Sequence, residues 1–292
     1  MRLKKCIVPM LCFLILILSA CQETKQEKTA TTTKTDEKVE NSINYTTTPT
    51  LFIHGAGGGR SSLGYMIKRF NNQKVASKSL VVIVSSDGSI STENKLNSEQ
   101  FSNDNPMIQV LFKDNRNNEW EQARWIKLVL EFLQREYNVK EVNIVGHSMG
   151  GISGLRYLLQ DSQTTDLPKV NKLVAIGSPF NEFIDTLANQ TLDELLTEGP
   201  SEKSDRYILY ENELNGLATD VNMLLIAGKI SDEELSDSVV PLSSAFSVNK
   251  MLLDHGNQVE YVLVEGHGAN HSDLHENQIV DEVVSQFLWD KK

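Results

Sequence analysis

A serine has a glycine two residues away on either side in the stretch Gly146-His147-Ser148-Met149-Gly150, which fits the pattern G-x-S-x-G. The apolar residues 142–145 precede it, and residues 152–160 have the composition of a helix. A serine held in a sharp turn from a strand into a helix needs small neighbours, because the turn leaves little room for side chains. The pattern therefore predicts that Ser148 is a nucleophile whose hydroxyl is exposed at the turn. The alternative is a helix start that only packs closely against a sheet.

A serine hydroxyl is a weak nucleophile at neutral pH and needs a base, usually a histidine that a carboxylate orients. The histidines that follow Ser148 are His255, His267, His271 and His275. The base should lie in the loop after the last strand, which leaves His267 and His271 as candidates. His255 precedes that strand, and His275 is expected inside the closing helix.

The carboxylate should follow the apolar run 223–227, between the serine and the histidine in the chain. The candidates are Asp232, Glu233, Glu234 and Asp237. An acidic run of this kind is ordinarily a solvated turn, so most of these side chains are expected to be exposed.

Apolar runs alternate with amphipathic stretches from residue 49 onward. Strands are predicted at 51–53, 80–84, 142–145, 173–176, 223–227 and 261–264, and helices at 61–71, 119–137, 152–160 and 279–289. Strands that are apolar on both faces and separated by helices indicate an α/β fold, with a mainly parallel central sheet and helices on both faces.

Two segments interrupt this alternation. Residues 85–109 are polar and rich in Asn and Ser, which predicts a hairpin or a surface excursion. Residues 181–220 are acidic, with short helical pieces. Because long insertions often carry function, this second segment is a possible small helical cap over the site. The alternative is a surface insertion without a role at the site.

Five motifs give the chain a resemblance to a known superfamily across about residues 49–289. They are His54-Gly55-Ala56-Gly57-Gly58, Gly146-His147-Ser148-Met149-Gly150-Gly151, Gly177-Ser178-Pro179-Phe180, Asp237-Ser238-Val239-Val240-Pro241 and His271-Ser272-x-Leu274. The chain resembles the α/β-hydrolase superfamily in its lipase and esterase branch. Within it, the chain is most similar to the cell-surface α/β-hydrolases of Gram-positive bacteria.

The resemblance implies a catalytic triad of Ser148, His271 and Asp237. It also implies an oxyanion hole made of the backbone N–H groups of Met149, which follows the nucleophile, and of Ala56, in the loop after the first strand. The implied activity is that of a serine hydrolase that cleaves carboxylic (acyl) esters, so the partner is a small-molecule or lipid ester. The same triad could serve an acyltransferase or a thioesterase, and the fold could also be a catalytically idle surface-binding module.

No cofactor is expected. His267, His271 and His275 are spaced four residues apart, which would place them on one face of a helix and so raises a metal site. Gly266 and Gly268 disfavour a helix there, and the chain lacks an H-E-x-x-H motif, so no metal site is predicted.

The first 20 residues have the pattern of a lipoprotein signal peptide. Arg2, Lys4 and Lys5 precede the apolar residues 6–18. Leu18-Ser19-Ala20-Cys21 then resembles a bacterial lipobox, in which the cysteine carries the lipid. We therefore expect a lipid on Cys21, a flexible tether over residues 21–48 and a hydrolase domain over residues 49–292. The alternative for the start of the chain is an uncleaved anchor, which also places the rest outside the cytoplasmic membrane.

Composition excludes several other functions. The three cysteines are Cys6, Cys12 and Cys21, so residues 22–292 hold no disulfide framework, thiol nucleophile or cysteine-bound metal. The net charge of −11 argues against nucleic acid as a partner, because an acidic surface repels phosphates, and it assigns membrane contact to the lipid at Cys21. Neither charge nor motif indicates the oligomeric state.

Overall fold

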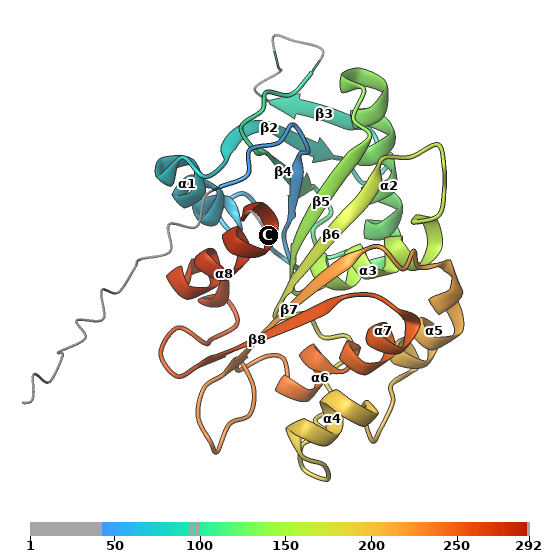
Figure 1. The fold of residues 1–292 in the computed structure, drawn as a ribbon, viewed down its shortest axis with the longest axis vertical. Coiled ribbons are helices and arrows are strands. Elements are labelled where there is room, and N and C mark those ends of the chain that lie inside the picture. The colour runs from blue at the N-terminus through green and yellow to red at the C-terminus, as the bar shows by residue number, and fades with distance from the viewer. Residues whose placement is uncertain (1–42, 94–95, 97–99, 291–292) are drawn as a thin grey trace, which may run out of the picture. The chain divides into compact units, whose positions relative to one another are not determined.

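The computed structural model describes residues 43–93, 96 and 100–290 of the 292-residue chain, in which strands and helices alternate (Figure 1). The strands are β1 (Thr50–Ile53), β2 (Ser77–Val84), β3 (Ile90–Glu93), β4 (Pro106–Phe112), β5 (Glu141–His147), β6 (Lys169–Ile176), β7 (Asn222–Lys229) and β8 (Val259–Glu265). The helices are α1 (Gly64–Gln73), α2 (Glu119–Tyr137), α3 (Met149–Asp161), α4 (Leu192–Glu198), α5 (Asp205–Glu213), α6 (Leu242–Phe246), α7 (Asn249–His255) and α8 (Gln278–Trp289). Short 3₁₀ helices form η1 (Leu214–Gly216) and η2 (Leu274–Glu276).

The described strands form one sheet in the order β3-β2-β4-β1-β5-β6-β7-β8. β2 and β3 are antiparallel, and every other neighbouring pair is parallel. The carboxyl ends of the parallel strands therefore meet at one edge of the sheet, where the loops after β1, β5, β7 and β8 come together. This arrangement confirms the mainly parallel α/β architecture that the sequence predicts.

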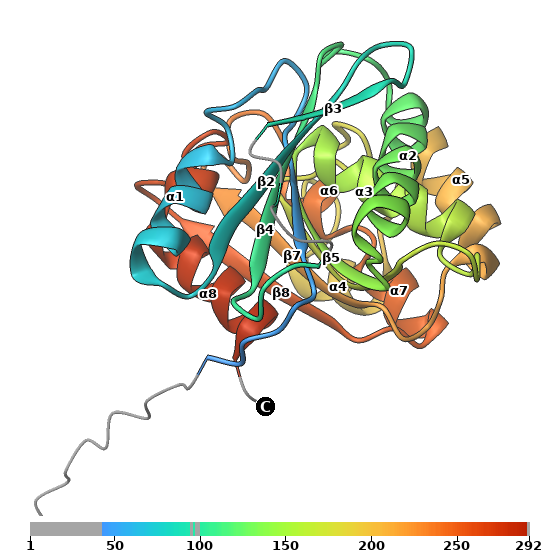
Figure 2. The same ribbon diagram turned by 90° about the horizontal axis from the view of Figure 1, so that it is seen from above.

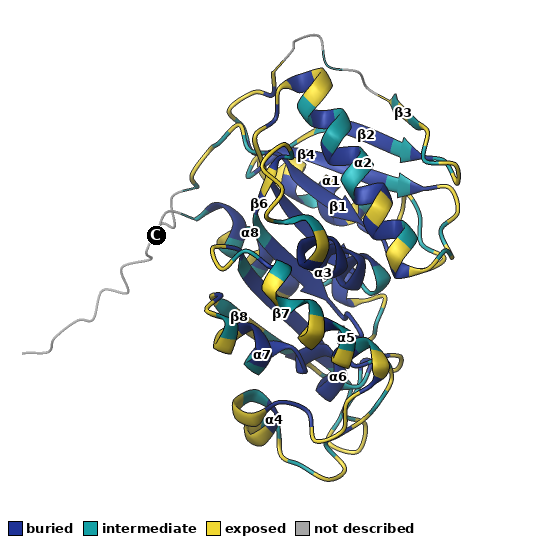
Figure 3. Ribbon diagram, turned by 90° about the vertical axis from the view of Figure 1, so that its right-hand side faces the viewer, coloured by how far each residue is buried: buried dark blue, intermediate teal, exposed yellow. Residues whose placement is uncertain are grey.

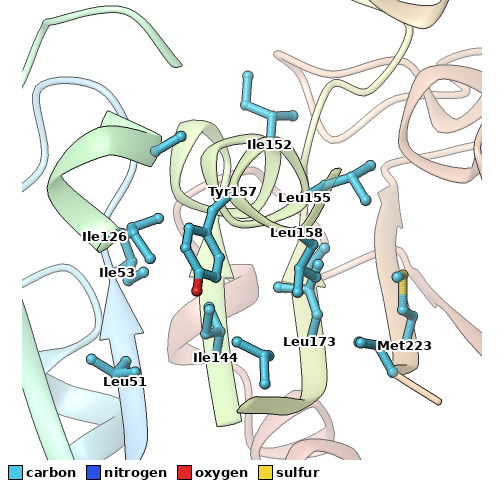
Figure 4. Packing of buried hydrophobic residues seen from close by; sticks show 14 of the residues in the cluster. Leu51, Ile53, Ile126, Ile144, Ile152, Leu155, Tyr157, Leu158, Leu173 and Met223 are labelled. Atoms are coloured by element: carbon cyan, nitrogen blue, oxygen red, sulfur yellow. The ribbon is translucent and has the colours of Figure 1, made fainter. Parts of the chain in front are cut away.

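Helices cover both faces of the sheet, with α1 and α8 on one side and α2 and α3 on the other (Figure 2). Neighbouring residues of a strand point to opposite faces, so both must be apolar when both faces are covered. In β1, Leu51 and Ile53 pack in the cluster under α2 and α3, while Phe52 packs with Phe70 of α1. Figure 4 shows Leu51, Ile53, Ile144 and Leu173 below the apolar residues of α3.

Helix α3 is buried over nearly its whole length, as Figure 3 shows. It carries Arg156, whose side chain has no exposed surface and is paired with Glu119 at 2.7 Å and with Glu213 at 2.8 Å. Glu119 also accepts a 2.6 Å bond from Arg206. Removing one partner of such a buried network costs about 3–5 kcal/mol, because a charge is left without compensation.

The same network holds the segment 181–220, since Arg206 and Glu213 both belong to α5. Helix α5 lies against α3, and α4 lies against α6 and α7. The short helical pieces that the sequence predicts in this segment are thus present and packed on the α3 face of the sheet.

Part of the prediction for residues 85–109 is wrong. A hairpin is present, because β3 pairs with β2. However, residues 106–109 begin β4, an interior strand that pairs with both β1 and β2. The prediction failed because Asn105, Pro106 and Gln109 are polar or strand-breaking residues, and yet all three are buried.

Residues 43–48, which the sequence analysis assigns to the tether, are bonded to the body. Ile43 forms an antiparallel bridge with Asp290, and the N–H of Asn44 donates to the carbonyl of Trp289 at 2.6 Å. Thr46 exchanges backbone and side-chain bonds with Asn105. The predicted signal peptide and Cys21 lie outside the described residues.

Candidate functional site

Ser148 lies in the turn between β5 and α3, at φ 53° and ψ −120°. A non-glycine residue in this region stores strain of about 1–3 kcal/mol, which the surrounding structure must hold. Its N–H donates to the carbonyl of Ile176 at 2.8 Å. A Cβ added to Gly146 would lie 2.4 Å from the carbonyl carbon of Gly150, and one added to Gly150 would lie 2.3 Å from the carbonyl oxygen of Ile53. The two glycines of the motif are therefore sterically required by the turn.

His271 and Asp237 are brought together from the loops after β8 and β7. The Nδ1 of His271 lies 2.7 Å from Oδ2 of Asp237, and the backbone N–H of His271 donates to the carbonyl of Asp237 at 2.8 Å. The other carboxylate oxygen of Asp237 accepts from the N–H groups of Val239 at 3.0 Å and Val240 at 2.7 Å. Three side-chain bonds thus hold this buried carboxylate, and Nε2 is the ring nitrogen of His271 that remains for a substrate.

Ser148 and His271 line the same pocket, which has a volume of about 250 Å³. Its other walls are the loop from Gly55 to Gly58 and the side chains of Ser62, His147, Ser272 and His275. The structure therefore places the predicted nucleophile and base at one cavity, with the predicted acid buried directly behind the base.

Gly177, at the end of β6, leaves room for this pair. Its φ is 55°, and a Cβ at this position would lie 2.9 Å from Oδ2 of Asp237 and 3.2 Å from Nδ1 of His271. A side chain here would thus meet both members of the histidine–carboxylate bond.

The two predicted oxyanion donors have no acceptor within the described residues. Ala56 lines the pocket, and Met149 is the first residue of α3, directly after the predicted nucleophile. The loop that carries Ala56 is fixed directly after it by Asn115, because the N–H of Gly57 donates to the carbonyl of Asn115 and the side chain of Asn115 donates to the carbonyl of Gly58, each at 2.7 Å. Both amides can therefore donate to an oxyanion without breaking another bond.

His147 is a further residue of the site, which the sequence reasoning missed. A carbonyl can only accept, so Nε2 of His147 donates to the carbonyl oxygen of His271 at 2.9 Å. The ring of His147 also lies 4.6 Å from that of His271 and 4.7 Å from that of His275. Burial, and then the proximity of His271 and His275, hold the pKa of His147 well below its usual range. No spacing signal could have found this role, because His147 occupies a variable position of the motif.

His54 anchors the loop after β1. Its Nε2 accepts from the N–H of Phe112 at 3.1 Å, so Nδ1 carries the proton and donates to the carbonyl of Gly55 at 2.8 Å. Burial lowers the pKa of His54, which keeps the ring neutral and preserves both bonds.

The other candidate bases and acids named in the sequence analysis are not members of the predicted triad. His267 is exposed and does not line the pocket. His275 lines the pocket but lies in η2, so its predicted place in the closing helix is wrong; Asn277 caps α8 after it. Burial lowers the pKa of His275. Asp232, Glu233 and Glu234 are exposed.

Three features are absent around the site in the part of the chain that the structure describes: a metal-binding cluster, a membrane-spanning helix, and a wall formed by the segment 181–220. In residues 43–93, 96 and 100–290, no group of three or more His, Cys, Asp or Glu side chains is arranged to hold a metal ion. No helix in this part of the chain is both long and apolar enough to cross a membrane. The segment 181–220, the possible cap, contributes no residue to the pocket lining.

The chain is similar to known proteins over most of its length. A family model described as alpha/beta hydrolase of unknown function (DUF915) matches residues 37–291. The crystal structure of a gene product of Listeria innocua has 28% identity and a TM-score of 0.75, and the match covers 84% of this chain and 95% of that one. A Lactobacillus plantarum WCFS1 protein, assigned provisionally as a cell surface hydrolase, has 19% identity and a TM-score of 0.63 over 82% of this chain and 89% of that one.

A search among curated proteins found no match. The family model alone spans far more than half of the chain. The strand order and the turn at Ser148 agree with it, and the resemblance of the motifs is confirmed at the level of the superfamily. The chain belongs to this family of α/β hydrolases.

Proposed function

We propose that the chain is a serine hydrolase that cleaves carboxylic (acyl) esters, with Ser148 as nucleophile, His271 as base and Asp237 as the residue that orients the base. The observation that carries the proposal is the 2.7 Å bond between His271 and the buried Asp237, at a pocket that the strained Ser148 also lines. A hydroxyl, an imidazole with one nitrogen already bonded to a carboxylate, and unpaired amides form the set that acyl transfer requires.

In the acylation step, the Ser148 hydroxyl attacks the ester carbonyl carbon while Nε2 of His271 takes its proton. The negative charge that develops on the carbonyl oxygen is stabilised by the N–H groups of Ala56 and Met149. The bond to the alcohol then breaks, and His271 gives its proton to the departing oxygen. Asp237 holds Nδ1 throughout and stabilises the charged imidazole.

In the deacylation step, His271 removes a proton from water, which attacks the acyl-serine carbonyl. The same two N–H groups stabilise the second oxyanion. Collapse releases the carboxylic acid and returns the proton from His271 to Ser148, so the enzyme is regenerated.

The pocket favours small groups next to the reacting carbonyl. Its volume of about 250 Å³ lies below the roughly 300–1,000 Å³ that is usual for ligand pockets. Its lining residues are glycine, alanine, serine and histidine, without a large apolar side chain. Among p-nitrophenyl esters, we therefore expect short acyl chains to be cleaved with a higher kcat/KM than long ones.

We also propose that the enzyme acts outside the cell, anchored by a lipid at Cys21. The support is the lipobox-like sequence before Cys21 and the description of the Lactobacillus plantarum relative as a cell surface protein. Mass spectrometry of the mature amino terminus tests this proposal. An unmodified Cys21 in the native host would contradict it.

Labelling with a fluorophosphonate probe tests the catalytic proposal, because the probe reacts only with an activated serine. The parent protein should be labelled, and Ser148→Ala should not. Ser272→Ala is the matched control, since Ser272 is an exposed serine that lines the same pocket. No labelling of well-folded parent protein would contradict the proposal and favour a binding module without catalysis.

A further inference from the structure

A second pair of an imidazole and a carboxylate lies at the pocket beside Ser148. Nδ1 of His275 lies 3.1 Å from Oε1 of Glu276. An ionised carboxylate can only accept, so Nδ1 carries the proton and donates it to this bond. His275 is only 8% exposed, and it lines the same pocket as Ser148. The acyl-transfer steps use the pair of His271 and Asp237, so this second pair is left without a role.

The other ring nitrogen of His275 is an accessible acceptor. Burial lowers the pKa of His275, although Glu276 opposes this effect, so the ring is neutral near neutral pH. With the proton on Nδ1, Nε2 presents a lone pair. No residue in the described part of the chain bonds to Nε2, and this atom is not sealed from solvent. A group that enters the pocket can therefore donate a hydrogen bond to it.

Arg69 of α1 fixes the segment that carries His275. It donates to the carbonyl of His275 at 2.8 Å and to Oε2 of Glu276 at 2.7 Å. Its guanidinium also bonds to both carboxylate oxygens of Asp281, which is only 3% exposed. One arginine thus holds the main chain of His275 and, through Glu276, the orientation of its ring.

His275 and His271 lie on the same side of the pocket. Both belong to the segment between β8 and α8, and their ring centroids lie 4.7 Å and 4.6 Å from that of His147. In acyl transfer the base gives its proton to the oxygen of the departing alcohol, so this oxygen lies at Nε2 of His271. The rest of a small alcohol is thereby brought toward His275.

The chemistry of this side of the pocket selects a neutral hydrogen-bond donor. Nε2 of His275 accepts and carries no charge, so an alkyl group beside it would leave the acceptor without a partner at a cost in binding free energy. No lysine, arginine, aspartate or glutamate side chain lines the pocket among the described residues. A charged group on the alcohol would therefore find no counterion, whereas a hydroxyl group would find an acceptor.

From these contacts we infer that the substrate is an ester of a polyol, in which the alcohol carries a second hydroxyl group close to the ester oxygen. This hydroxyl group donates to Nε2 of His275 while the ester oxygen receives the proton from His271. Hydrolysis then releases the carboxylic acid and the free polyol. His275 determines specificity and transfers no proton. The inference rests on the serine hydrolase function proposed for Ser148, and it names the class of alcohol that is released.

Two acetate esters of nearly equal size test the inference. Ethylene glycol monoacetate has a hydroxyl group where propyl acetate has a methyl group. The parent should hydrolyse the glycol ester with the higher kcat/KM. His275→Phe should reduce the ratio of the two kcat/KM values about tenfold, because the acceptor is lost while a ring remains. The kcat/KM for propyl acetate should stay within about threefold of the parent value.

Two further variants separate the acceptor from the packing of the ring. His275→Gln supplies an amide oxygen, which also accepts, and should retain part of the preference for the glycol ester. His267→Phe is the matched control, because it makes the same change at an exposed histidine outside the pocket and should leave the ratio unchanged. Labelling with a fluorophosphonate probe shows whether each variant keeps a folded site with an activated serine.

Two results would overturn the inference and leave the hydrolase function in place. One is a parent enzyme without preference for the glycol ester. The other is a ratio that His275→Phe does not change, which would mean that His275 supports the pocket without contacting the alcohol. A parent protein that is neither labelled nor active on either ester would overturn the proposed function, and the inference with it.

Discussion

His147 donates a hydrogen bond from Nε2 to the carbonyl oxygen of His271, 2.9 Å away, and the two imidazole rings lie 4.6 Å apart. The residue before the predicted nucleophile thus holds the main chain and ring of the predicted base. Asp237 fixes the same histidine from the other side, through its side chain and its carbonyl. His271 is therefore positioned at once by the end of β5 and by the loop after β7.

We expect His147→Phe to lower kcat by about 10- to 100-fold with little change in KM, because it keeps a ring in place and removes only the donor to His271. Steady-state kinetics with a short-chain p-nitrophenyl ester would measure this split. His267→Phe is the control, since His267 is exposed and outside the pocket. An unchanged kcat for His147→Phe would show that the bond to His271 has no positioning role.

The two candidate bases can be separated directly. We expect His271→Ala to lower kcat/KM by about 10⁴-fold or more, since the proton of Ser148 then has no acceptor. His267→Ala should leave kcat/KM within about twofold, the ordinary range for an exposed residue without a partner. Initial rates for both variants at equal folded concentration decide between them, and the reverse order would transfer the base to His267.

Asp237→Asn should leave the fold intact and lower kcat by about 10³- to 10⁴-fold, because an amide can donate to Nδ1 and select the wrong tautomer of His271. Glu234→Gln is the matched control, since it makes the same chemical change at an exposed residue. Circular dichroism should show the same spectrum for both variants. Similar rates for the two would contradict the assignment of the acid.

Gly177→Ala should reduce activity about 100-fold and destabilise the protein by more than about 1 kcal/mol. The added methyl would contact the bonded atoms of Asp237 and His271, at a backbone with φ of 55°. Gly59→Ala is the control, because a Cβ there meets no atom within 4 Å. Rates and urea midpoints of the two variants test this expectation. Equal rates and equal midpoints would mean that Asp237 and His271 can move aside for the methyl group without loss of activity or stability.

Stability should fall as the pH decreases below about 6.5. In the unfolded chain His54, His147 and His275 bind protons at this pH, whereas burial lowers the pKa of each in the folded protein. The unfolded state then holds more protons, so each histidine removes up to about 1.4 kcal/mol per pH unit until its folded pKa is reached. Above about pH 6.5 this contribution is fully present.

Urea unfolding between about pH 7.5 and 5.5 measures this slope, in a range above the titration of most carboxylates. In His147→Phe, the dependence of the unfolding free energy on pH should decrease by the equivalent of up to one bound proton, because one of the three buried histidines is gone. The same pH dependence in parent and variant would show that His147 does not contribute to the loss of stability at low pH.

Local patterns were enough to predict most of the elements that position the site. The apolar run before Ser148 and the helix after it are β5 and α3, and α2 spans the same residues, 119–137, as predicted. These elements bury one or both faces, so their hydrophobic period is strong. Strand β4 was not predicted at all, because this buried strand carries Pro106 and Gln109, which local patterns associate with loops.

The relations between loops could not be predicted. The bond from His147 to His271 joins residues 124 positions apart, and the ion pair between Arg156 and Glu213 joins α3 to α5. Both are products of packing, which the order of residues along a strand does not specify. The bond between Ile43 and Asp290 was missed for the same reason, since residues 22–48 have the composition of a flexible segment.

The bridge between Ile43 and Asp290 also determines where a force applied to the ends of the described chain enters the folded body. Residues 44–49 lead into the start of β1, and α8 ends beside them, so both ends of the described chain leave the body at the amino ends of the strands. Ser148 lies at the opposite edge. A mechanical load applied through either terminus, whether from a lipid, a tag or a solid support, therefore enters far from the pocket. An immobilised enzyme attached in this way would present its catalytic edge to the solution.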